Sequence, residues 1–213
     1  MNKFFITISL SFITACLLSQ SEKTILLNQP DTTKGLPLMK TLAIRSSERD
    51  FDTTSLKLQD LSDLLWAANG VNRPESGKRT APSAMNSQEV DIYVSLKSGV
   101  YFYNAQKSQL EFIVENDLRH AIADRQQNMA SAPVFLLLVS DISRLKYGND
   151  SSKVVIAALD AGIVSQNISL FCASAGFSTV PRATMNHQKL KQLLQLKDTQ
   201  HLMLNHPVAY KKK

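Results

Sequence analysis

The spacing of apolar residues predicts a series of helices. They cover residues 36–44, 58–69, 118–129, 153–175 and 187–195. Apolar side chains recur in them at three- and four-residue intervals, which places these side chains on one side of a helix. Pro37 suits a first helical position, Asn186 caps the last helix, and Gly70 and Gly176 follow helix ends, where glycine is favoured. The 153–175 stretch is apolar on nearly all sides, so we expect it to lie buried in the middle of the fold.

Other stretches have the two-residue period of strands. The expected strands cover residues 90–97, 100–104, 134–139 and 201–208. Strict alternation over 90–97 predicts one buried and one exposed face, and Ser98-Gly99 turns the chain into the next strand. The 134–139 run is apolar throughout and predicts a central strand. With 71–85 as a loop, the pattern predicts one α+β domain with no repeat and no internal linker.

The N-terminal segment is typical of a secretory signal. Residues 4–15 form an apolar run of 12 residues, shorter than a membrane-spanning helix needs. The sequence Ile13-Thr14-Ala15-Cys16 resembles a bacterial lipobox, whose cysteine carries a lipid; ordinary cleavage without a lipid is the alternative. We expect export, to the periplasm or to a membrane through lipidated Cys16, over a cytoplasmic location. The expected divisions are a signal over 1–20, a polar linker over 21–35 and a domain over 36–213.

Composition and charge exclude several classes of function. Apolar residues make up 44% of the chain and charged residues 20%, as in an ordinary globular domain. The net charge is +6, of which the last three lysines supply half, and the aromatic residues are scattered, so nucleic-acid binding is not expected. Two cysteines make no disulfide framework, and Cys172 lies in an apolar stretch that predicts a small buried side chain.

Common metal and nucleotide motifs are missing from the sequence. Neither G-x-G-x-x-G nor G-x-x-x-x-G-K-[ST] occurs. The histidines are His120, His187, His201 and His206, and none has Cys or carboxylate partners at the spacing of metal ligands. We therefore predict no metal and interpret these histidines as surface or capping residues.

A short segment concentrates groups that suit a phosphate. Arg45, Ser46, Ser47 and Arg49 bring two guanidinium groups and two hydroxyls into five residues. Arginine offers paired, charge-assisted hydrogen bonds to phosphate, and serine adds short neutral donors. The alternative is a solvated turn in which Glu48 and Asp50 neutralise the arginines.

A set of motifs along the chain resembles the flavin-dependent nitroreductase family, and the motifs occur in the family's order. They are Arg45-Ser46-Ser47-Glu48-Arg49-Asp50-Phe51, Leu64-Leu65-Trp66-Ala67-Ala68-Asn69-Gly70, the P-S-x-x-N-x-Q segment within Thr80–Tyr93, Lys146-Tyr147-Gly148, Leu159-Asp160-Ala161-Gly162 with Gln166-Asn167, Ala175-Gly176-Phe177-Ser178-Thr179-Val180-Pro181, and Pro207-Val208-Ala209-Tyr210. Several of them resemble in particular the SagB-type branch, which is related to azoline oxidases. The resemblance spans residues 36–210.

The resemblance implies a fold and a cofactor. The implied fold is a nitroreductase-like α+β fold, with a central mixed or antiparallel sheet flanked by helices, and the implied site binds FMN at a homodimer interface. Arg45 and Ser47 would hold the phosphate and ribityl region with help from Ser46, and Arg49 would lie by the pyrimidine edge of the ring. The remaining implied contacts are Pro82, Ser83, Ala84 and Asn86 to the flavin of the other subunit, Pro181, Arg182, Ala183 and Thr184 near the N5 side of the ring, and Lys211 and Lys213 at the phosphate.

The implied activity is an FMN-dependent oxidoreductase that transfers hydride between a reduced donor, such as NAD(P)H, and a small organic acceptor in ping-pong fashion. Lys146 and Tyr147 match the pair that handles a proton in azoline oxidases, although they lie in a polar loop that could equally be a solvated connection. The alternative is an exported, lipoprotein-type module that binds flavin or a partner without turnover. Arg182 departs from the family pattern and would place a bulky cation near the flavin.

Overall fold

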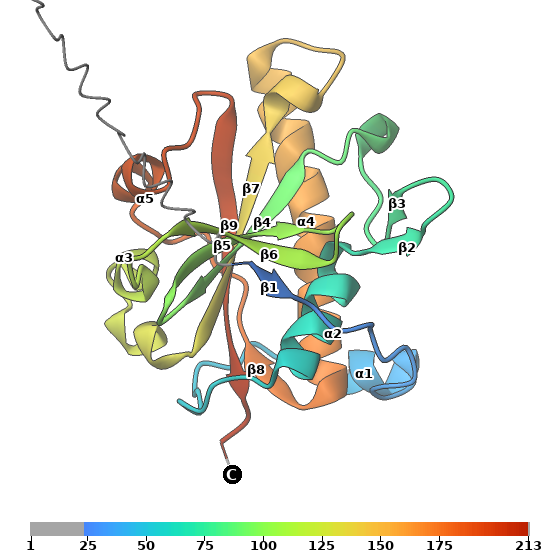
Figure 1. The fold of residues 1–213 in the computed structure, drawn as a ribbon, viewed down its shortest axis with the longest axis vertical. Helices are drawn as coiled ribbons and strands as arrows, with labels where there is room; N and C mark the ends of the chain where they lie inside the picture. Colours follow the sequence, from blue (N-terminus) through green and yellow to red (C-terminus); the bar gives the residue numbers. More distant parts are fainter. Residues whose placement is uncertain (1–23, 213) are drawn as a thin grey trace, which may run out of the picture.

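A seven-stranded sheet forms the centre of the molecule (Figure 1). The computed structural model describes residues 24–212. The strand order is β1-β6-β5-β4-β7-β9-β8, and all neighbouring strands are antiparallel. The strands are β1 Ile25–Leu26, β4 Val90–Leu96, β5 Gly99–Asn104, β6 Gln109–Val114, β7 Val134–Asp141, β8 Phe177–Thr179 and β9 Gln200–Tyr210. The predicted α+β class with an antiparallel sheet is confirmed, and β7 lies inside the sheet as predicted.

Helices cover both faces of this sheet (Figure 1). The α-helices are α1 Leu38–Ile44, α2 Leu58–Asn69, α3 Arg119–Ala123, α4 Asp150–Ala175 and α5 His187–Leu193. Short 3-10 turns lie at η1 Ala84–Asn86, η2 Gln127–Ser131 and η3 Ile142–Arg144. Helices α2 and α4 pack on one face, and α3 and α5 pack on the other.

Strand β4 has two buried faces, which corrects the prediction of one exposed face. Ile92 packs toward α2 and α4 and is 1% exposed, whereas Tyr93 packs toward α3 and is 7% exposed. The alternation of apolar and polar residues therefore separates two buried environments. Asp91 and Ser95 are buried polar residues on the second face.

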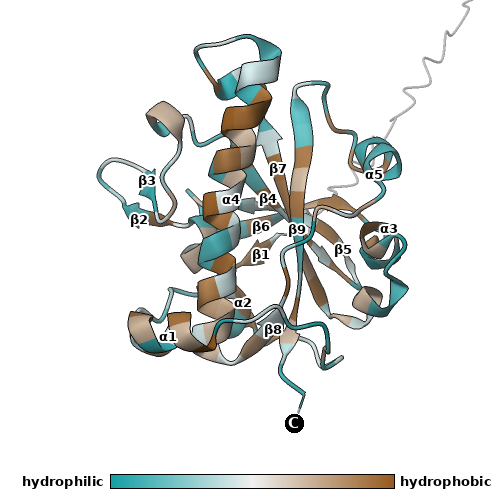
Figure 2. Cartoon of the chain, turned by 180° about the vertical axis from the view of Figure 1, so that it is seen from behind, coloured by the Kyte–Doolittle hydropathy of each residue, from teal (hydrophilic) through white to brown (hydrophobic). Residues whose placement is uncertain are grey.

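Helix α4 has one exposed apolar side, which corrects the expectation of burial all round. The side chain of Asn149 caps its start by accepting a hydrogen bond from Ser152 N. Gly176 ends it at φ +80°, as the glycine predicted. Val155, Leu159 and Ile163 are exposed, and Figure 2 shows α4 on the outside of the sheet with apolar turns along its length. The helix is long and apolar enough to span a membrane, a test that core helices of soluble proteins also pass.

Some local predictions are wrong in detail. The helix expected over 118–129 ends at Ala123, because Asp124 has φ +51° and interrupts it before η2. Gly70 follows α2 with φ −75°, so it is no left-handed cap; a Cβ there would come within 2.6 Å of Trp66 Cα. The region 71–85 is not all loop, because strands β2 (Val71–Arg73) and β3 (Lys78–Arg79) pair within it.

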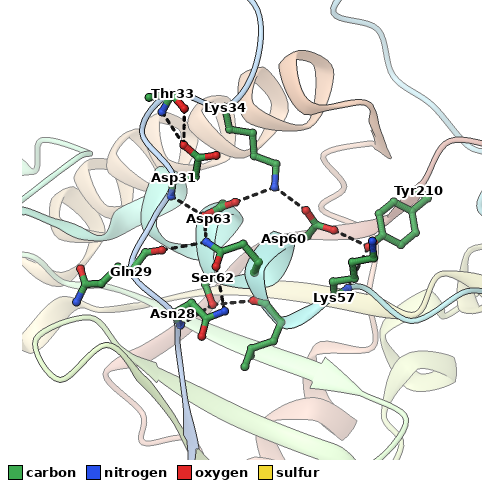
Figure 3. A network of polar contacts seen from close by, with 12 residues as sticks. Asn28, Gln29, Asp31, Thr33, Lys34, Lys57, Asp60, Ser62, Asp63 and Tyr210 are labelled. Atoms are coloured by element: carbon green, nitrogen blue, oxygen red, sulfur yellow. Dashed lines mark hydrogen bonds and ion pairs between the residues drawn. The ribbon is translucent and has the colours of Figure 1, made fainter.

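The segment over 24–35 is ordered against the domain, which corrects the expectation of a linker there. Strand β1 pairs with β6, and Leu27 N donates to Ser108 O. Figure 3 shows the following residues along α2, where Asp31 N donates to Asp63 Oδ1 at 2.9 Å. Lys34 Nζ lies 2.7 Å from Asp63 Oδ2 and also binds Asp60. We call residues 24–36 the N-terminal strap. The predicted signal over 1–20 with Cys16, and the tail residue Lys213, lie outside the described residues.

His206 is a core residue, contrary to the expectation of a surface or capping histidine. It is fully buried in β9, with Nε2 2.8 Å from Ser165 Oγ and Nδ1 3.2 Å from Thr179 Oγ1. Burial lowers the pKa of His206 to about 3, so the ring is neutral at ordinary pH. It joins α4 to β8 through hydroxyl contacts. Cys172 is buried as predicted, and its thiol is free.

Candidate functional site

The Arg45–Phe51 segment is pinned to the end of the sheet. At its start, Arg45 N donates to Thr41 O in the last turn of α1. In its middle, Glu48 N donates to Thr179 O at 2.9 Å. At its end, Phe51 is 2% exposed in the core on the α3 side of the sheet. The segment is therefore held by its backbone and by one aromatic anchor, and its polar side chains point outward.

The acidic residues of this segment do not neutralise its arginines. Glu48 forms an ion pair with Lys211 at 3.9 Å, and Asp50 pairs with Lys212. Within residues 24–212 no ion pair is formed by Arg45 or Arg49. This geometry opposes the alternative of a self-neutralised turn and leaves an exposed cationic patch beside β8.

The serines of the segment differ in availability. Ser46 Oγ donates to Glu48 Oε1 at 2.5 Å, so its hydroxyl proton is already in use. Ser47 is exposed. Lys211 lies at the same place, since its backbone N donates to Gly176 O. The residues predicted to bind phosphate therefore lie together around Arg45, Ser47 and Lys211. Ser46 is hydrogen-bonded to Glu48 instead.

The turn after β8 lies next to this patch. Pro181, Ala183 and Thr184 are exposed, whereas Arg182 is 6% exposed. Arg182 and Asn205 exchange two backbone hydrogen bonds at 2.9 and 2.7 Å, and Asn205 Nδ2 donates to Thr184 O. The turn is therefore fixed to β9.

Arg182 does not present its cation to the open side of this turn, which corrects the sequence-based expectation. Its Nε donates to Gln126 Oε1, one terminal nitrogen to Asn205 Oδ1 and the other to Ala123 O, each at 2.8–2.9 Å. Three acceptors from two segments, the end of α3 and strand β9, hold the guanidinium beneath the turn. Arg182 is a structural clamp between α3 and β9.

The predicted contacts over 82–86 lie elsewhere in the same chain. Ser83 Oγ accepts a hydrogen bond from Gln88 N, and Ala84 N donates to Asp160 Oδ2 at 2.7 Å, while Asn86 is exposed. The Arg45 segment instead follows α1, which lies near Ser174 of α4. From Asp160 to Ser174 the helix advances 14 residues, about 20 Å, and Figure 1 shows η1 and α1 beside opposite ends of α4. One chain therefore does not bring the two groups together.

Lys146 and Tyr147 lie near η1 rather than near the cationic patch. Both are exposed, and Tyr147 is 68% exposed. The preceding Leu145 packs in a small cluster that Ala84 also joins. Gly148 follows at φ +97°, a conformation that favours glycine, and a Cβ there would meet Ser152 Oγ at 2.5 Å.

Behind η1 lies a group of buried charges that sequence reasoning missed. Glu89 is fully buried and Asp160 is 7% exposed. Asp91 binds Arg144, which also donates to Gln88 O at 2.8 Å. Burial raises the pKa of Asp91, and the Arg144 guanidinium opposes that change. Alternation over 90–97 assigned Asp91 to an exposed face, so the only available signal was an acidic residue at the start of a predicted strand.

The described part of the chain offers no metal centre. Between residues 24 and 212 no group of three or more His, Cys, Asp or Glu side chains is placed to hold a metal ion. The site instead has exposed cations, a hydroxyl and a fixed backbone turn. Such groups suit an anionic organic ligand bound at the surface.

The chain is an antiparallel α+β domain with exposed cations beside one end of its sheet, and comparison with known proteins places it in a family. The model of the nitroreductase family matches residues 42–210. The chain belongs to the nitroreductase family.

Individual relatives agree with this family. A Methanocaldococcus jannaschii protein that carries the name nitroreductase is 29% identical over 187 residues, covering 83% of this chain and 92% of its own length. A nitroreductase crystal structure from Ralstonia eutropha is 36% identical with a TM-score of 0.84, and the match covers 92% of this chain and 93% of that one. The Escherichia coli microcin synthetase complex contains a chain with the same fold, at 14% identity and a TM-score of 0.69, covering 97% of this chain and 85% of that one.

Proposed function

We propose that this nitroreductase-family oxidoreductase uses FMN, works as a homodimer, and transfers hydride between a reduced donor such as NAD(P)H and a small organic acceptor in ping-pong fashion. The observation that carries this proposal is the cationic patch of Arg45, Ser47 and Arg49, whose neighbouring acids are paired with Lys211 and Lys212. When bound, FMN supplies the hydride chemistry, and the protein binds and orients it.

The residues present fit this group. Arg45, Ser47 and Lys211 can bind the phosphate, and Arg49 can lie at the pyrimidine edge of the ring. The fixed turn of Pro181, Ala183 and Thr184 can support the ring through its backbone, because Arg182 and Asn205 hold it rigid. The proposal keeps Arg182 as the clamp of this turn rather than as a side chain at the ring.

The homodimer follows from the split of the site. Residues Pro82, Ser83, Ala84 and Asn86 can reach the cofactor only from a second copy. In their own chain they lie beside the opposite end of α4 from Arg45. The exposed apolar side of α4, with Leu159 at 66% exposure, offers a surface for that copy. A groove of about 460 Å³ between α1, α2 and α4 adjoins it. Lys146 and Tyr147 remain candidates for moving a proton at the same end of α4.

The first experiment measures the absorption spectrum of the purified chain from Ser21 to Lys213, followed by release and mass determination of any chromophore. We expect flavin bands and one FMN per subunit. In Arg45→Ala/Arg49→Ala, two charge-assisted hydrogen bonds are lost, so the Kd for FMN should rise about 100-fold. Lys40→Ala, an exposed cation on α1, is the matched control. A colourless protein that takes up no added FMN would refute the proposal.

Rapid mixing with NADH or NADPH tests turnover. Fast bleaching of the flavin bands supports the oxidoreductase, and binding without bleaching by any reductant tried supports the non-catalytic alternative, which the relatives do not favour.

A second arm tests the dimer. Leu159→Asp should give a monomer by light scattering and should lose FMN, because the second set of contacts is missing. Ile113→Asp, at an exposed position of β6, should stay dimeric. A dimeric Leu159→Asp protein with unchanged FMN affinity would contradict the assignment of this face.

Export stays a further proposal that rests on residues 1–20 and Cys16. The mass of the mature chain from a bacterial membrane fraction checks it: loss of the signal with an added diacylglycerol supports lipidation. An intact N-terminus in the cytoplasmic fraction would contradict export.

A further inference from the structure

Two acidic side chains meet behind the η1 turn. Glu89 is fully buried at the start of β4, and Asp160 on α4 is 7% exposed. Both carboxyl groups hold the same turn and lie close enough to each other to interact. Among residues 24–212, Glu89 Oε1 has no conventional donor. Two ionised carboxylates only accept hydrogen bonds and repel each other, so one proton held between the two groups would stabilise this arrangement.

The same two carboxyl groups hold the turn above them. Asp160 Oδ2 accepts the Ala84 N–H at 2.7 Å, and Glu89 Oε2 accepts a hydrogen bond from Ser87 Oγ at 2.9 Å. The turn needs such support, since Met85, Asn86 and Gln88 have φ values of +52°, +55° and +49°. Left-handed backbone at non-glycine residues costs free energy and persists where surrounding contacts impose it.

We propose that Glu89 and Asp160 act as a carboxyl pair sharing one proton, which positions the 83–88 turn so that loss of the proton loosens the turn and weakens cofactor binding. The inference rests on the proposed function, because residues 82–86 reach the cofactor only in the FMN-binding homodimer. Both acids act through the turn and are positioning residues.

The surroundings do not compensate a second negative charge. The cation near the pair is Arg144 of η3, but its guanidinium is bound to Asp91 and to Gln88 O. From η1 the pair meets the neutral hydroxyl of Ser87. Burial, and then the contact with Asp160, raise the pKa of Glu89 to about 7. The shared proton therefore leaves within the ordinary pH range.

The test compares FMN affinity at pH 6 and pH 8 by fluorescence titration of the full dimeric protein. If only the protonated pair is competent, its fraction falls about tenfold between these values, and the Kd for FMN rises by the same factor. Glu89→Gln keeps an amide donor toward Asp160 and removes the titration, so this ratio of Kd values should fall to near one. Glu111→Gln, on exposed β6, is the matched control and should keep the ratio. The FMN phosphate titrates equally in all three proteins, so the ratios are compared with one another.

A second readout needs no cofactor. Amide hydrogen exchange of peptides spanning 83–88 should accelerate from pH 6 to pH 8 more in the wild type than in Glu89→Gln, beyond the intrinsic pH effect shared by both. Equal ratios of Kd in the wild type and Glu89→Gln would overturn the inference. If no FMN binds at any pH, the proposed function fails by itself. The exchange comparison then tests the carboxyl pair on its own. Equal acceleration of exchange in the wild type and in Glu89→Gln would overturn the inference.

Discussion

At the scale of single residues, burial decides which charges are available to a ligand. Arg45 and Arg182 are both arginines near the β8 end of the sheet, yet only Arg45 is exposed. Arg182 is enclosed because Asn205, Gln126 and Ala123 each offer it an acceptor. The sequence could not distinguish these roles, since the acceptors lie 23 to 59 positions away along the chain.

Replacing Arg182 by alanine should destabilise the fold. The substitution leaves Asn205 Oδ1 buried without the Arg182 donor and leaves Ala123 O with only the Gln126 N–H, which costs about 3 kcal/mol of unfolding free energy. Urea denaturation followed by circular dichroism measures this change. Arg125→Ala, at a neighbouring exposed position, should stay within about 0.5 kcal/mol of the wild type. If both variants lose equal stability, Arg182 is not the clamp described here.

At the scale of elements, periodicity predicted most helices and strands, and contacts decided the rest. Helix α2, strand β7 and helix α5 follow from local pattern alone. The two buried faces of β4 do not, because α3 covers one face from a distant part of the sequence. The arginine segment was found from its residue types, whereas the Glu89–Asp160 pair depends on a contact across 71 residues, from position 89 to position 160.

The strap is an ordered element that the polar composition of its residues did not predict. Its residues bind α2 through hydrogen bonds and one lysine (Figure 3), and Ile25 and Leu27 pack against the core. Asp60, which binds Lys34, also accepts a hydrogen bond from the hydroxyl of Tyr210, at 2.6 Å. The strap is thereby connected to β9 and to the end that carries Lys211.

Replacing Lys34 by methionine should loosen the strap. Asp63 is 2% exposed and would lose its cation, which costs roughly 2 kcal/mol because Lys34 itself is partly exposed. We expect protease cleavage within 24–36 well before the rest of the chain, measured by mass spectrometry. Lys40→Met on α1 is the control. Resistance of the strap in Lys34→Met would show that β1 and the hydrogen bonds to Ser62 and Asp63 hold the strap without the lysine.

At the scale of the whole molecule, two buried titratable groups act on stability in opposite directions. His206 has a folded pKa of about 3, so below pH 6.5 the unfolded chain takes up a proton that the folded protein refuses, and stability falls as pH falls. Glu89 has a folded pKa of about 7, so between pH 7 and 4.5 the folded protein keeps a proton that the unfolded chain has lost, and stability rises as pH falls. The two effects offset each other between about pH 4.5 and 6.5.

The Glu89→Gln substitution should reveal the pH dependence of stability that His206 causes. Without the Glu89 proton, the unfolding free energy should fall by about 1 kcal/mol per pH unit on average as pH drops from 6.5 to 5, whereas the wild type should change little. Urea denaturation at three pH values measures both slopes. A flat Glu89→Gln profile would mean that His206 is protonated in the folded protein.

The short strand β1 also bears on solubility. It pairs with Gln109 and Leu110 and so covers one end of the outer edge of β6, a strand of six residues. A chain trimmed to begin at Leu36, at the boundary the sequence suggested, would bare that edge and offer other molecules a template for strand pairing. The strap should therefore oppose aggregation, and we expect the protein to become less monodisperse when this polar segment is removed.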